Sequence, residues 1–597
     1  MIANWIQLWL RNLLRFKLYT IINVSGLSLG IFAVVAIFVY VTDELKYDRF
    51  HENGGSIYRI NTLTHFDGNE DSYFTTSAPL AENAVANIEG LEAVARLFGR
   101  QASIQLIDTK TGSLSEDKFR EENFFLTDPS VFKIFSFEFI MGDPELALKD
   151  PAGLVINREI AEKYFGSPEA AMGRDILFEG ERSLTISGVI ENYPHQSHLA
   201  IKMLAHFEHY YTEETPETAQ YLRTDWLYNP LLTYVLLKQG RRPSAVEVEL
   251  NALKNRLADE RVVKGVTYTL QSLHDIHLHS NFSFTEQANN MQDVYILSSI
   301  GLLILLLACI NFVNLSNAHS LKRAKEIGVR KVLGAQKKSL ITQFLCESSA
   351  LVFLSFIIAF GLLIAALSLI NQITNKHFTV ADLFSANLLI GLYILFVVTA
   401  FLAGLYPSFY ATRFQPAVVL KGILGHRHTE GFLLRKTLMV FQFTVSMALV
   451  VMGIVFYQQM NFVKVKPLGF QRDHMLTIPL FSDTPNSILG GGVDGPLRAR
   501  MNTFETEVIK RSQIEAVSVS SALPGAGAVN ALVQTEKIKP GDNVFVAVTA
   551  VDYDFLETYK MELLAGRNFS KDYGTDHLQA FIVNEQAVKA LGWNNPN

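Results

Sequence analysis

Three histidines stand within a run of six residues, His274, His277 and His279, and imidazole nitrogens are common metal ligands. If this run is a strand, His277 and His279 lie on one face and could bind a metal ion. A second pair, His195 and His198, is equally weak evidence for a metal site, because two nearby histidines are common. The simpler interpretation is a polar strand that leads back to the next apolar segment, and we therefore predict that the chain holds no metal.

Sequence motifs for nucleotide and zinc chemistry do not occur in the chain. The sequence has no G-x-x-x-x-G-K-[ST] loop, whose backbone amides would hold the phosphates of ATP, and no H-E-x-x-H motif. Protein-kinase signatures are also missing. We predict that the chain is not an enzyme, needs no cofactor of its own, and takes any energy from a partner.

The segment 321–335, LKRAKEIGVRKVLGA, has the periodicity of a short helix. At about 100° per residue, Arg323, Glu326 and Arg330 lie on one stripe. The stripe is bordered by Ile327 and Leu333, and the smaller opposite face contains Leu321, Ala324, Gly328 and Val332. One face of such a helix can lie on lipid while the other binds a protein. A general excess of positive charge explains the basic residues but not the ordered stripe.

Five stretches without Asp, Glu, Lys or Arg are long enough to cross a bilayer, which takes about 20 apolar residues in a helix. They are residues 18–42, 294–321, 348–375, 383–412 and 437–463. We predict that all five span the lipid bilayer. In the first, Gly26 and Gly30 form a G-x-x-x-G pattern that allows helix backbones to approach closely.

Residues 1–17 precede the first predicted span and contain Trp5 and Trp9. This pattern predicts an amphipathic helix in the membrane interface. Such a helix could brace the first span during movement, or it could serve as a simple anchor, and both interpretations stay open.

Lys and Arg residues gather at one end of the spans, and in membrane proteins that end faces the cytoplasm. Three segments, residues 1–17, 322–347 and 413–436, contain 15 basic and three acidic residues, whereas the rest of the chain carries a net charge of −18. The short segment 376–382 has only Lys376 and Asp382. We predict a multi-pass protein of the bacterial inner membrane with a cytoplasmic N-terminus.

Two large regions then lie outside the cytoplasm, residues 43–293 and residues 464–597. The first is long enough to form its own core. Strand-like runs at 184–190, 231–237 and 266–270 alternate with helical stretches at 160–164 and 245–257. This order predicts an α+β domain.

Three pairs of segments recur in the same order with nearly constant spacing. Residues 13–15 recur as 433–435, residues 132–142 (FKIFSFEFIMG) resemble 555–566 (FLETYKMELLAG), and residues 154–166 (LVINREIAEKYFG) resemble 581–592 (FIVNEQAVKALG). The pattern predicts an internal duplication of one span, an external domain and three spans. The second copy would then be incomplete at Asn597, and the alternative is a natural five-span protein.

Four segments resemble the MacB/FtsX-like ABC transporter permease family, in its duplicated form with two MacB-like periplasmic core domains. They are residues 47–60 (YDRFHENGGSIYRI), 275–280, 323–335 (RAKEIGVRKVLGA) and 404–422 (GLYPSFYATRFQPAVVLKG). The resemblance implies a membrane α-helical bundle with large extracytoplasmic α+β domains of the MacB periplasmic core type, the second of them truncated.

The resemblance also implies a partner, a cytoplasmic ABC ATPase of the LolD/MacB type that binds the ATP. The residues carried over to the coupling helix that docks on this ATPase are Arg323, Glu326, Ile327, Gly328, Arg330, Lys331 and Gly334. A periplasmic or outer-membrane component is a further candidate partner, and nucleic acid is not expected.

Two functions fit the resemblance. A permease of the MacB/FtsX/LolC-E type would use ATP hydrolysis by its partner to move the external domains and export or extract a hydrophobic or peptide-like cargo. The alternative is a mechanotransmitter that carries no cargo and regulates an extracytoplasmic partner such as a cell-wall hydrolase or a sensor.

Overall fold

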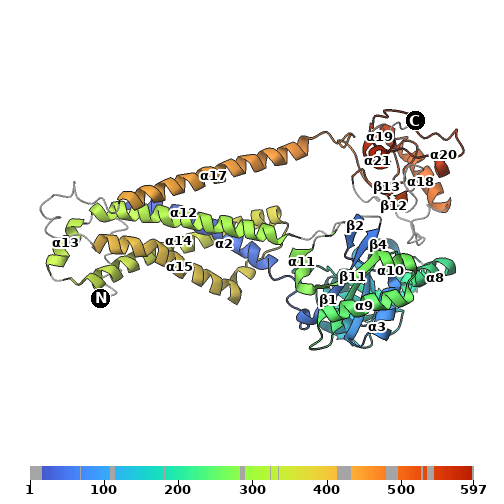
Figure 1. Cartoon of the computed structure of the whole chain (residues 1–597), viewed down its shortest axis with the longest axis horizontal. Helices are drawn as coiled ribbons and strands as arrows, with labels where there is room; N and C mark the ends of the chain where they lie inside the picture. Colours follow the sequence, from blue (N-terminus) through green and yellow to red (C-terminus); the bar gives the residue numbers. More distant parts are fainter. Residues whose placement is uncertain are drawn as a thin grey trace. The chain divides into compact units, whose positions relative to one another are not determined.

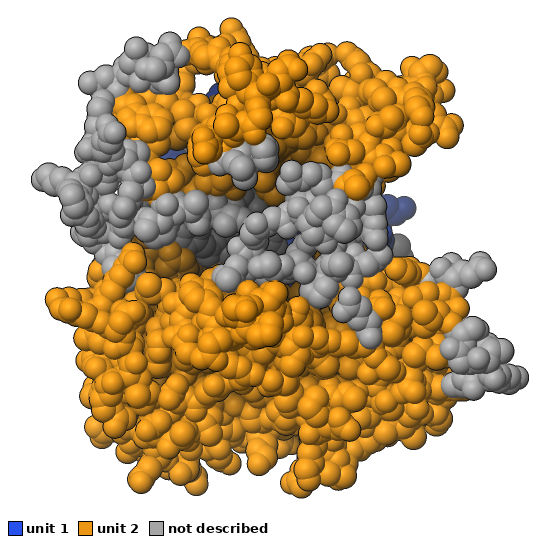
Figure 2. Space-filling view, turned by 90° about the vertical axis from the view of Figure 1, so that its right-hand side faces the viewer, with its two compact units in different colours: residues 1–47, 289–464 blue, residues 48–288, 465–597 orange. Residues whose placement is uncertain are grey.

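The structure is a computed structural model of the 597-residue chain, and its description covers most of that length. Described are residues 16–66, 69–107, 114–180, 182–280, 282, 289–322, 324–333, 335–412, 432–478, 495–525, 529–533 and 544–593. These residues form two compact units (Figure 2). The first unit comprises Met1–Tyr47 and Asn289–Lys464, and the second comprises Asp48–Ala288 and Val465–Asn597.

Five helices in the described residues are long and apolar enough to cross a membrane, which confirms the predicted number (Figure 1). They are α2 (Lys17–Glu44), α12 (Met291–Lys322), α14 (Lys337–Thr374), α15 (Ala386–Thr412) and α17 (Phe432–Val465). Leu, Ile, Val and Phe dominate each helix, and in lipid a helix satisfies its own backbone hydrogen bonds.

Helices α2, α12, α14 and α15 pack side by side in the first unit (Figure 1). Their shared core contains Leu27 and Ile31 of α2, Phe312 of α12 and Val352 of α14. In α17, by contrast, the most apolar stretch has no buried residue. The shared core of the described helices is therefore formed by α2, α12, α14 and α15.

Helix α14 is longer than the span predicted at 348–375, because it begins at Lys337. The sequence prediction began after Glu347, since it required a stretch without charged side chains. The added turns are amphipathic, and they bury Leu340 and Phe344 while Lys337 and Lys338 are exposed. The span predicted to begin at residue 383 instead starts as α15 at Ala386, because Asp382–Phe384 forms a separate 3-10 turn, η3.

The first part of the second unit is an α+β domain with an 11-stranded sheet, as the sequence predicts. The strands are β1 (Ile57–Phe66), β2 (Asn69–Tyr73), β3 (Leu91–Ile107), β4 (Leu114–Thr127), β5 (Phe139–Gly142), β6 (Gly153–Asn157), β7 (Asp175–Phe178), β8 (Arg182–Ile190), β9 (Met203–His206), β10 (Leu232–Leu237) and β11 (Val266–Ser272). Their order is β11-β1-β10-β3-β4-β9-β6-β8-β5, and β2 pairs with β1. The three strands expected from the sequence correspond to β8, β10 and β11.

Six of these strands form a closed ring, because β7 pairs with both β3 and β8 while β4, β9 and β6 complete the circuit. Alternate side chains of a closed sheet point inward and fill a small ring. The inside of this ring holds apolar residues such as Phe124, Ile156 and Phe178, all of them at most 1% exposed.

Helices cover this sheet and bury its other faces. They include α3 (Ala78–Asn87), α4 (Val131–Ile134), α5 (Arg158–Phe165), α8 (Pro216–Thr224) and α9 (Pro243–Leu257). Helices α5 and α9 are the two helical stretches that the sequence predicts. Helices α3 and α9 pack with β1, β10 and β11 around Leu80, Val235 and Leu250, each fully buried.

The C-terminal part of the second unit contains α18 (Gly495–Val508), β12 (Val529–Val533), β13 (Val544–Val548), α19 (Phe555–Thr558), α20 (Asp576–Gln579) and α21 (Glu585–Ala590). Its α21 has the same type of N-cap as α5 in the first domain. Asn157 accepts a hydrogen bond from Ile160 N, and Asn584 accepts one from Ala587 N. The C-caps differ: Gly166 caps α5 with a φ of 84°, whereas Leu591 caps α21 and the glycine with positive φ, Gly592 at 68°, comes one residue later. The duplication itself stays a prediction.

Candidate coupling site

A short helix, α13 (Ala324–Val332), connects the spans α12 and α14 at the basic segment that the sequence singled out. The amide of Leu333 donates to Val329 O at 3.0 Å, and the amide of Ala335 donates to Arg330 O at 3.0 Å, so the turn closes tightly. Helix α14 then begins at Lys337.

One face of α13 packs against the first turns of α14. Ile327 is only 3% exposed and forms a small apolar cluster with Leu340 and Phe344, and Ala335 packs against its edge. Burying an isoleucine side chain contributes about 1.5–3 kcal/mol. This contact attaches α13 to the start of α14.

A polar contact reinforces this attachment. Arg330 Nη1 donates to Gln343 Oε1 at 3.0 Å, and Gln343 Nε2 donates in turn to Glu347 Oε1 at 3.0 Å. The Gln343 amide therefore links the guanidinium of α13 to a carboxylate one turn further along α14. Hydrogen bonds to charged groups typically stabilise by about 1.5–3 kcal/mol.

The other face of α13 presents apolar side chains to the surroundings. Val329 is 46% exposed, Val332 64% and Leu333 81%. Burial and the positive charge of Lys337 lower the pKa of Lys331 in the same segment. An exposed apolar group bordered by basic residues is typical of a surface that binds another protein or a membrane.

The predicted coupling residues differ in whether the structure describes them and in what their side chains contact. Arg323 and Gly334 lie outside the described residues, whereas Glu326 and Gly328 lie within α13. Ile327 packs against α14, and Arg330 donates a hydrogen bond to Gln343 of α14. Both side chains are therefore engaged within the chain. The exposed valines and Leu333 were not among the predicted site residues, although the alternation of apolar and basic residues in the sequence contained that signal.

Two further predicted segments fall largely outside the described residues. The N-terminal interfacial helix at 1–17 is described only from residue 16 onward, and the cytoplasmic segment 413–436 only from residue 432 onward. Both stay predictions.

The predicted packing glycines of α2 face α12. A Cβ atom added at Gly30 would lie 2.6 Å from Ala308 Cβ, and one added at Gly26 would lie 3.4 Å from Asn311 Nδ2. Carbon atoms at 2.6 Å overlap, so no larger residue fits at position 30 without a shift of one helix.

The histidine run is not a strand. Residues Ile276–His279 form the short helix α11, so His277 and His279 do not share a face. The strand prediction was wrong because β11 ends at Ser272, where a 3-10 turn, η2 (Leu273–Asp275), begins. In the described part of the chain, no group of three or more His, Cys, Asp or Glu side chains is arranged to hold a metal ion.

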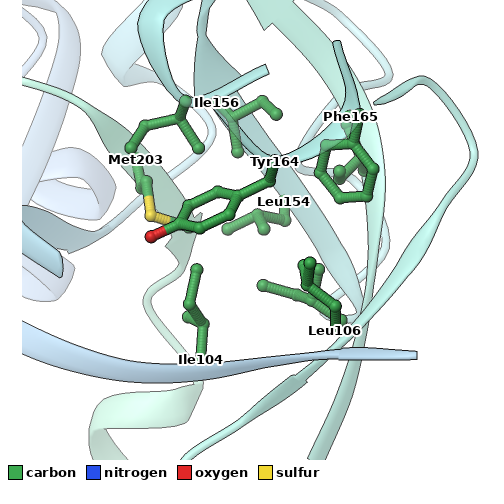
Figure 3. Close-up of a pocket in the computed structure, with 10 residues that line it drawn as sticks. Ile104, Leu106, Leu154, Ile156, Tyr164, Phe165 and Met203 are labelled. Carbon is green, nitrogen blue, oxygen red and sulfur yellow. The ribbon is translucent and has the colours of Figure 1, made fainter. Parts of the chain in front are cut away.

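A small apolar hollow lies inside the strand ring of the α+β domain, beneath α5 (Figure 3). It is lined by Ile104, Leu106, Leu154, Ile156, Ile160, Tyr164, Phe165, Ile176, Ile186 and Met203. The hydroxyl of Tyr164 donates a short hydrogen bond to Glu121. Aliphatic and aromatic carbons and the thioether of Met203 make up the rest of this lining, which suits core packing and offers no further polar group for orienting a ligand.

Family models match both the α+β domain and the helices of the first unit. The MacB-like periplasmic core domain matches residues 20–253, and the FtsX-like permease C-terminal domain matches residues 298–416. Together the two matches cover more than half of the chain. The chain belongs to the MacB/FtsX-like permease family.

Relatives of this permease share modest sequence identity with it. The macrolide export ATP-binding/permease protein MacB of Acinetobacter baylyi is 20% identical over 69% of this chain and 59% of its own length. The protein of the same name from Pasteurella multocida is 25% identical over 45% of this chain and 37% of its own length. This chain therefore spans about half of the length of such relatives, and it matches the permease domains.

Two solved structures are also similar to the MacB/FtsX-like permease described here. A domain of a permease protein from Porphyromonas gingivalis is 20% identical, with a TM-score of 0.32, over 41% of this chain and 98% of that one. The periplasmic region of MacB from Actinobacillus actinomycetemcomitans is 11% identical, with a TM-score of 0.27, over 37% of this chain and 91% of that one.

Proposed function

We propose that this permease binds a separate cytoplasmic ABC ATPase of the LolD/MacB type through α13 and transmits ATP-driven movement to its external domains. The observation that carries the proposal is the two-sided character of α13. Its inner face is fixed to α14 through Ile327 and Arg330, and its outer face exposes Val332 and Leu333.

This arrangement suits the transfer of movement from a partner to a span. A partner that displaced α13 would displace the start of α14 with it, because apolar packing and a charge-assisted hydrogen bond join the two helices. Helix α14 packs in turn against α2 and α15. In the proposed orientation, α13 faces the cytoplasm of a bacterial inner membrane, since the flanking segments are rich in Lys and Arg.

The proposed cargo is hydrophobic or peptide-like, and the proposed direction is outward. The relatives named above are macrolide export proteins, which favours export over the mechanotransmitter alternative. Those relatives are named as ATP-binding proteins as well as permeases, whereas this sequence has no phosphate-binding loop. A separate ATPase would supply the missing chemistry.

Binding to the ATPase is tested by co-purification. The full-length permease is expressed with LolD/MacB-type ATPases of the same genome, either as wild type or with Leu333→Asp. The matched control is Leu476→Asp, since Leu476 is 84% exposed and lies in the other compact unit. We expect Leu333→Asp to reduce ATPase recovery at least about ten-fold, as a buried charge at an interface costs several kcal/mol. Equal recovery with both variants would contradict docking through α13.

Export is tested in a deletion strain. Loss of the permease should raise the accumulation of macrolides or a hydrophobic dye, and the wild-type chain should restore efflux while Leu333→Asp should not. Unchanged accumulation together with altered cell-wall hydrolysis would favour the mechanotransmitter instead.

A further inference from the structure

In the first unit, Lys376 follows the end of α14 and forms ion pairs with the end of α2, which in turn contacts the segment before α12. Lys376 Nζ lies 2.9 Å from Asp43 Oδ2 and 2.8 Å from Glu44 Oε1, at the last turn of α2. It also donates to the hydroxyl of Tyr47 at 3.0 Å. Glu44 Oε2 accepts a hydrogen bond of 2.8 Å from Asn289, just before α12 begins.

This ion cluster is largely removed from solvent. The side chains of Lys376, Asp43 and Glu44 are 13%, 10% and 1% exposed. Burial alone would lower the pKa of Lys376, but Glu44, Tyr47 and Asp43 hold it above its ordinary value. One buried cation facing two carboxylates resists separation, because removing it would leave two unpaired buried charges.

The turn that carries Lys376 is itself held firmly. Helix α14 ends at Thr374, and Asn375 takes a left-handed conformation with φ of 52°. The side chain of Asn371 closes the turn by donating to Phe378 O at 2.9 Å and accepting from Phe378 N at 3.0 Å. Lys376 therefore projects from a fixed support on α14.

Asp48, the residue that follows Tyr47, is held by a second set of buried contacts, within the second unit. Asp48 has a left-handed backbone with φ of 56°, and its Oδ2 lies 2.9 Å from His198 Nδ1. Asp48 Oδ1 accepts from Ser197 Oγ at 3.0 Å, and His198 Nε2 lies 2.7 Å from the Tyr234 hydroxyl on β10. Asp48 and His198 are 0% and 5% exposed.

Tyr47 and Asp48 are thus consecutive residues, and each is held by buried groups of its own unit. We propose that Lys376 is a positioning residue that latches the outer end of α2 to the α14–α15 turn, so that movement of the spans passes through residues 47 and 48 into the external domain. The inference rests on the proposed function for its role in transport, while the latch itself can be measured without any ATPase.

The test must separate the latch from a simple contribution to folding. Lys376→Met alone leaves two buried carboxylates unpaired and can fail to fold. The decisive variant is therefore the neutral cluster Asp43→Asn, Glu44→Gln, Lys376→Met, which removes the cation without leaving unpaired charges. Lys376→Arg is the matched control, since it keeps the charge and the donors.

The first readout is hydrogen exchange of the full-length protein in nanodiscs. We expect amides of residues 43–48 to exchange at least about ten-fold faster in the neutral cluster than in wild type or Lys376→Arg, because local opening costs less without the latch. Equal exchange in all three proteins would overturn the latch.

The second readout is the ratio of transport to ATP hydrolysis in the complex with the ATPase. We expect the neutral cluster to bind the ATPase and hydrolyse ATP within about two-fold of wild type, while efflux falls at least about ten-fold. Wild-type efflux by the neutral cluster would overturn the positioning role. Failure of the wild-type chain to bind any ATPase would instead refute the proposed function, and the exchange measurement would still decide the latch.

Discussion

Arg330 of α13 donates from Nη1 to Oε1 of Gln343 on α14 at 3.0 Å, and this bond ties the proposed docking helix to a span. Gln343 is 7% exposed, and its Nε2 donates a second hydrogen bond to Glu347 Oε1. A docked ATPase would act on the spans through this bond and through the packing of Ile327.

Replacing Gln343 should therefore weaken transmission more than docking. We expect Gln343→Leu to retain ATPase binding within about three-fold and to lower ATP-driven efflux about ten-fold, because a hydrogen bond to a charged group is lost. The control is Gln372→Leu, an exposed position on the same helix. The two variants are compared by dye efflux at equal expression, and equal efflux would contradict a transmitting role.

The α2–α12 contact should not tolerate a methyl group at position 30. Gly30→Ala places Cβ 2.6 Å from Ala308 Cβ, and such overpacking costs about 1–3 kcal/mol. Gly361→Ala in α14 is the matched control, since its added Cβ meets no atom within 4 Å. We expect a lower midpoint of thermal unfolding in detergent for Gly30→Ala and an unchanged or higher one for Gly361→Ala. The reverse order would show that the two helices do not pack in this way.

The buried ion pair of Arg96 should matter more than an exposed pair of similar geometry. Arg96 is 9% exposed, contacts Asp128 at 2.7 Å and Glu82 at 2.8 Å, and lies over the ring of Phe207. We expect Arg96→Met to cost about 3 kcal/mol or more, because Asp128 would lose its partner.

The matched control is Arg158→Met. Arg158 lies 2.7 Å from Glu191, but both side chains are more than a third exposed, so the loss should stay below about 1 kcal/mol. Urea unfolding of the protein in which Trp5, Trp9 and Trp593 are replaced by Phe, followed by the fluorescence of the buried Trp226 that remains, measures both costs. Equal costs for the two variants would contradict the assigned burial.

The unfolding free energy of the α+β domain should fall as the pH is lowered, because His51 is buried in its neutral form. Burial lowers the pKa of His51 to about 4 from an ordinary value of 6.5. Between these values the unfolded chain binds more protons than the folded one. The stabilisation is thus complete above about pH 6.5 and is lost toward pH 4, up to about 3 kcal/mol.

Asp48 contributes to the pH dependence of stability in a lower pH range than His51. Burial alone would raise the pKa of Asp48, but His198 holds it below its ordinary value of 3.8. Its contribution is therefore present above about pH 4 and is lost only below that. We expect His51→Gln to flatten the dependence of the unfolding free energy on pH between 4 and 6.5, with the exposed His65→Gln as control. A slope unchanged by His51→Gln would contradict the assignment.

Sequence periodicity predicted the elements that bury one apolar face or are apolar throughout. The five apolar helices and the strands β8, β10 and β11 follow directly from long or alternating apolar runs. The prediction failed where a strand ends and a turn begins. The run around His277 has strand-like alternation, yet it forms a helix because β11 ends at Ser272 and a 3-10 turn intervenes.

The polar cluster around Lys376 had only a faint signal in the sequence, as the one Lys or Arg in the short segment 376–382. Its partners Asp43 and Glu44 lie more than three hundred residues away, and local patterns do not predict such pairs. The exposed Leu333 was interpreted as a border of the basic stripe, because sequence alone does not show which face of α13 packs on α14.

The most direct test of the central claim is ATP hydrolysis by a LolD/MacB-type ATPase with the full-length permease in nanodiscs. We predict that wild type and Leu476→Asp bind the ATPase and stimulate its hydrolysis of ATP, whereas Leu333→Asp does neither. No binding and no stimulation by the wild-type chain with any such ATPase of the same genome would contradict the claim that this permease works with a separate ATPase.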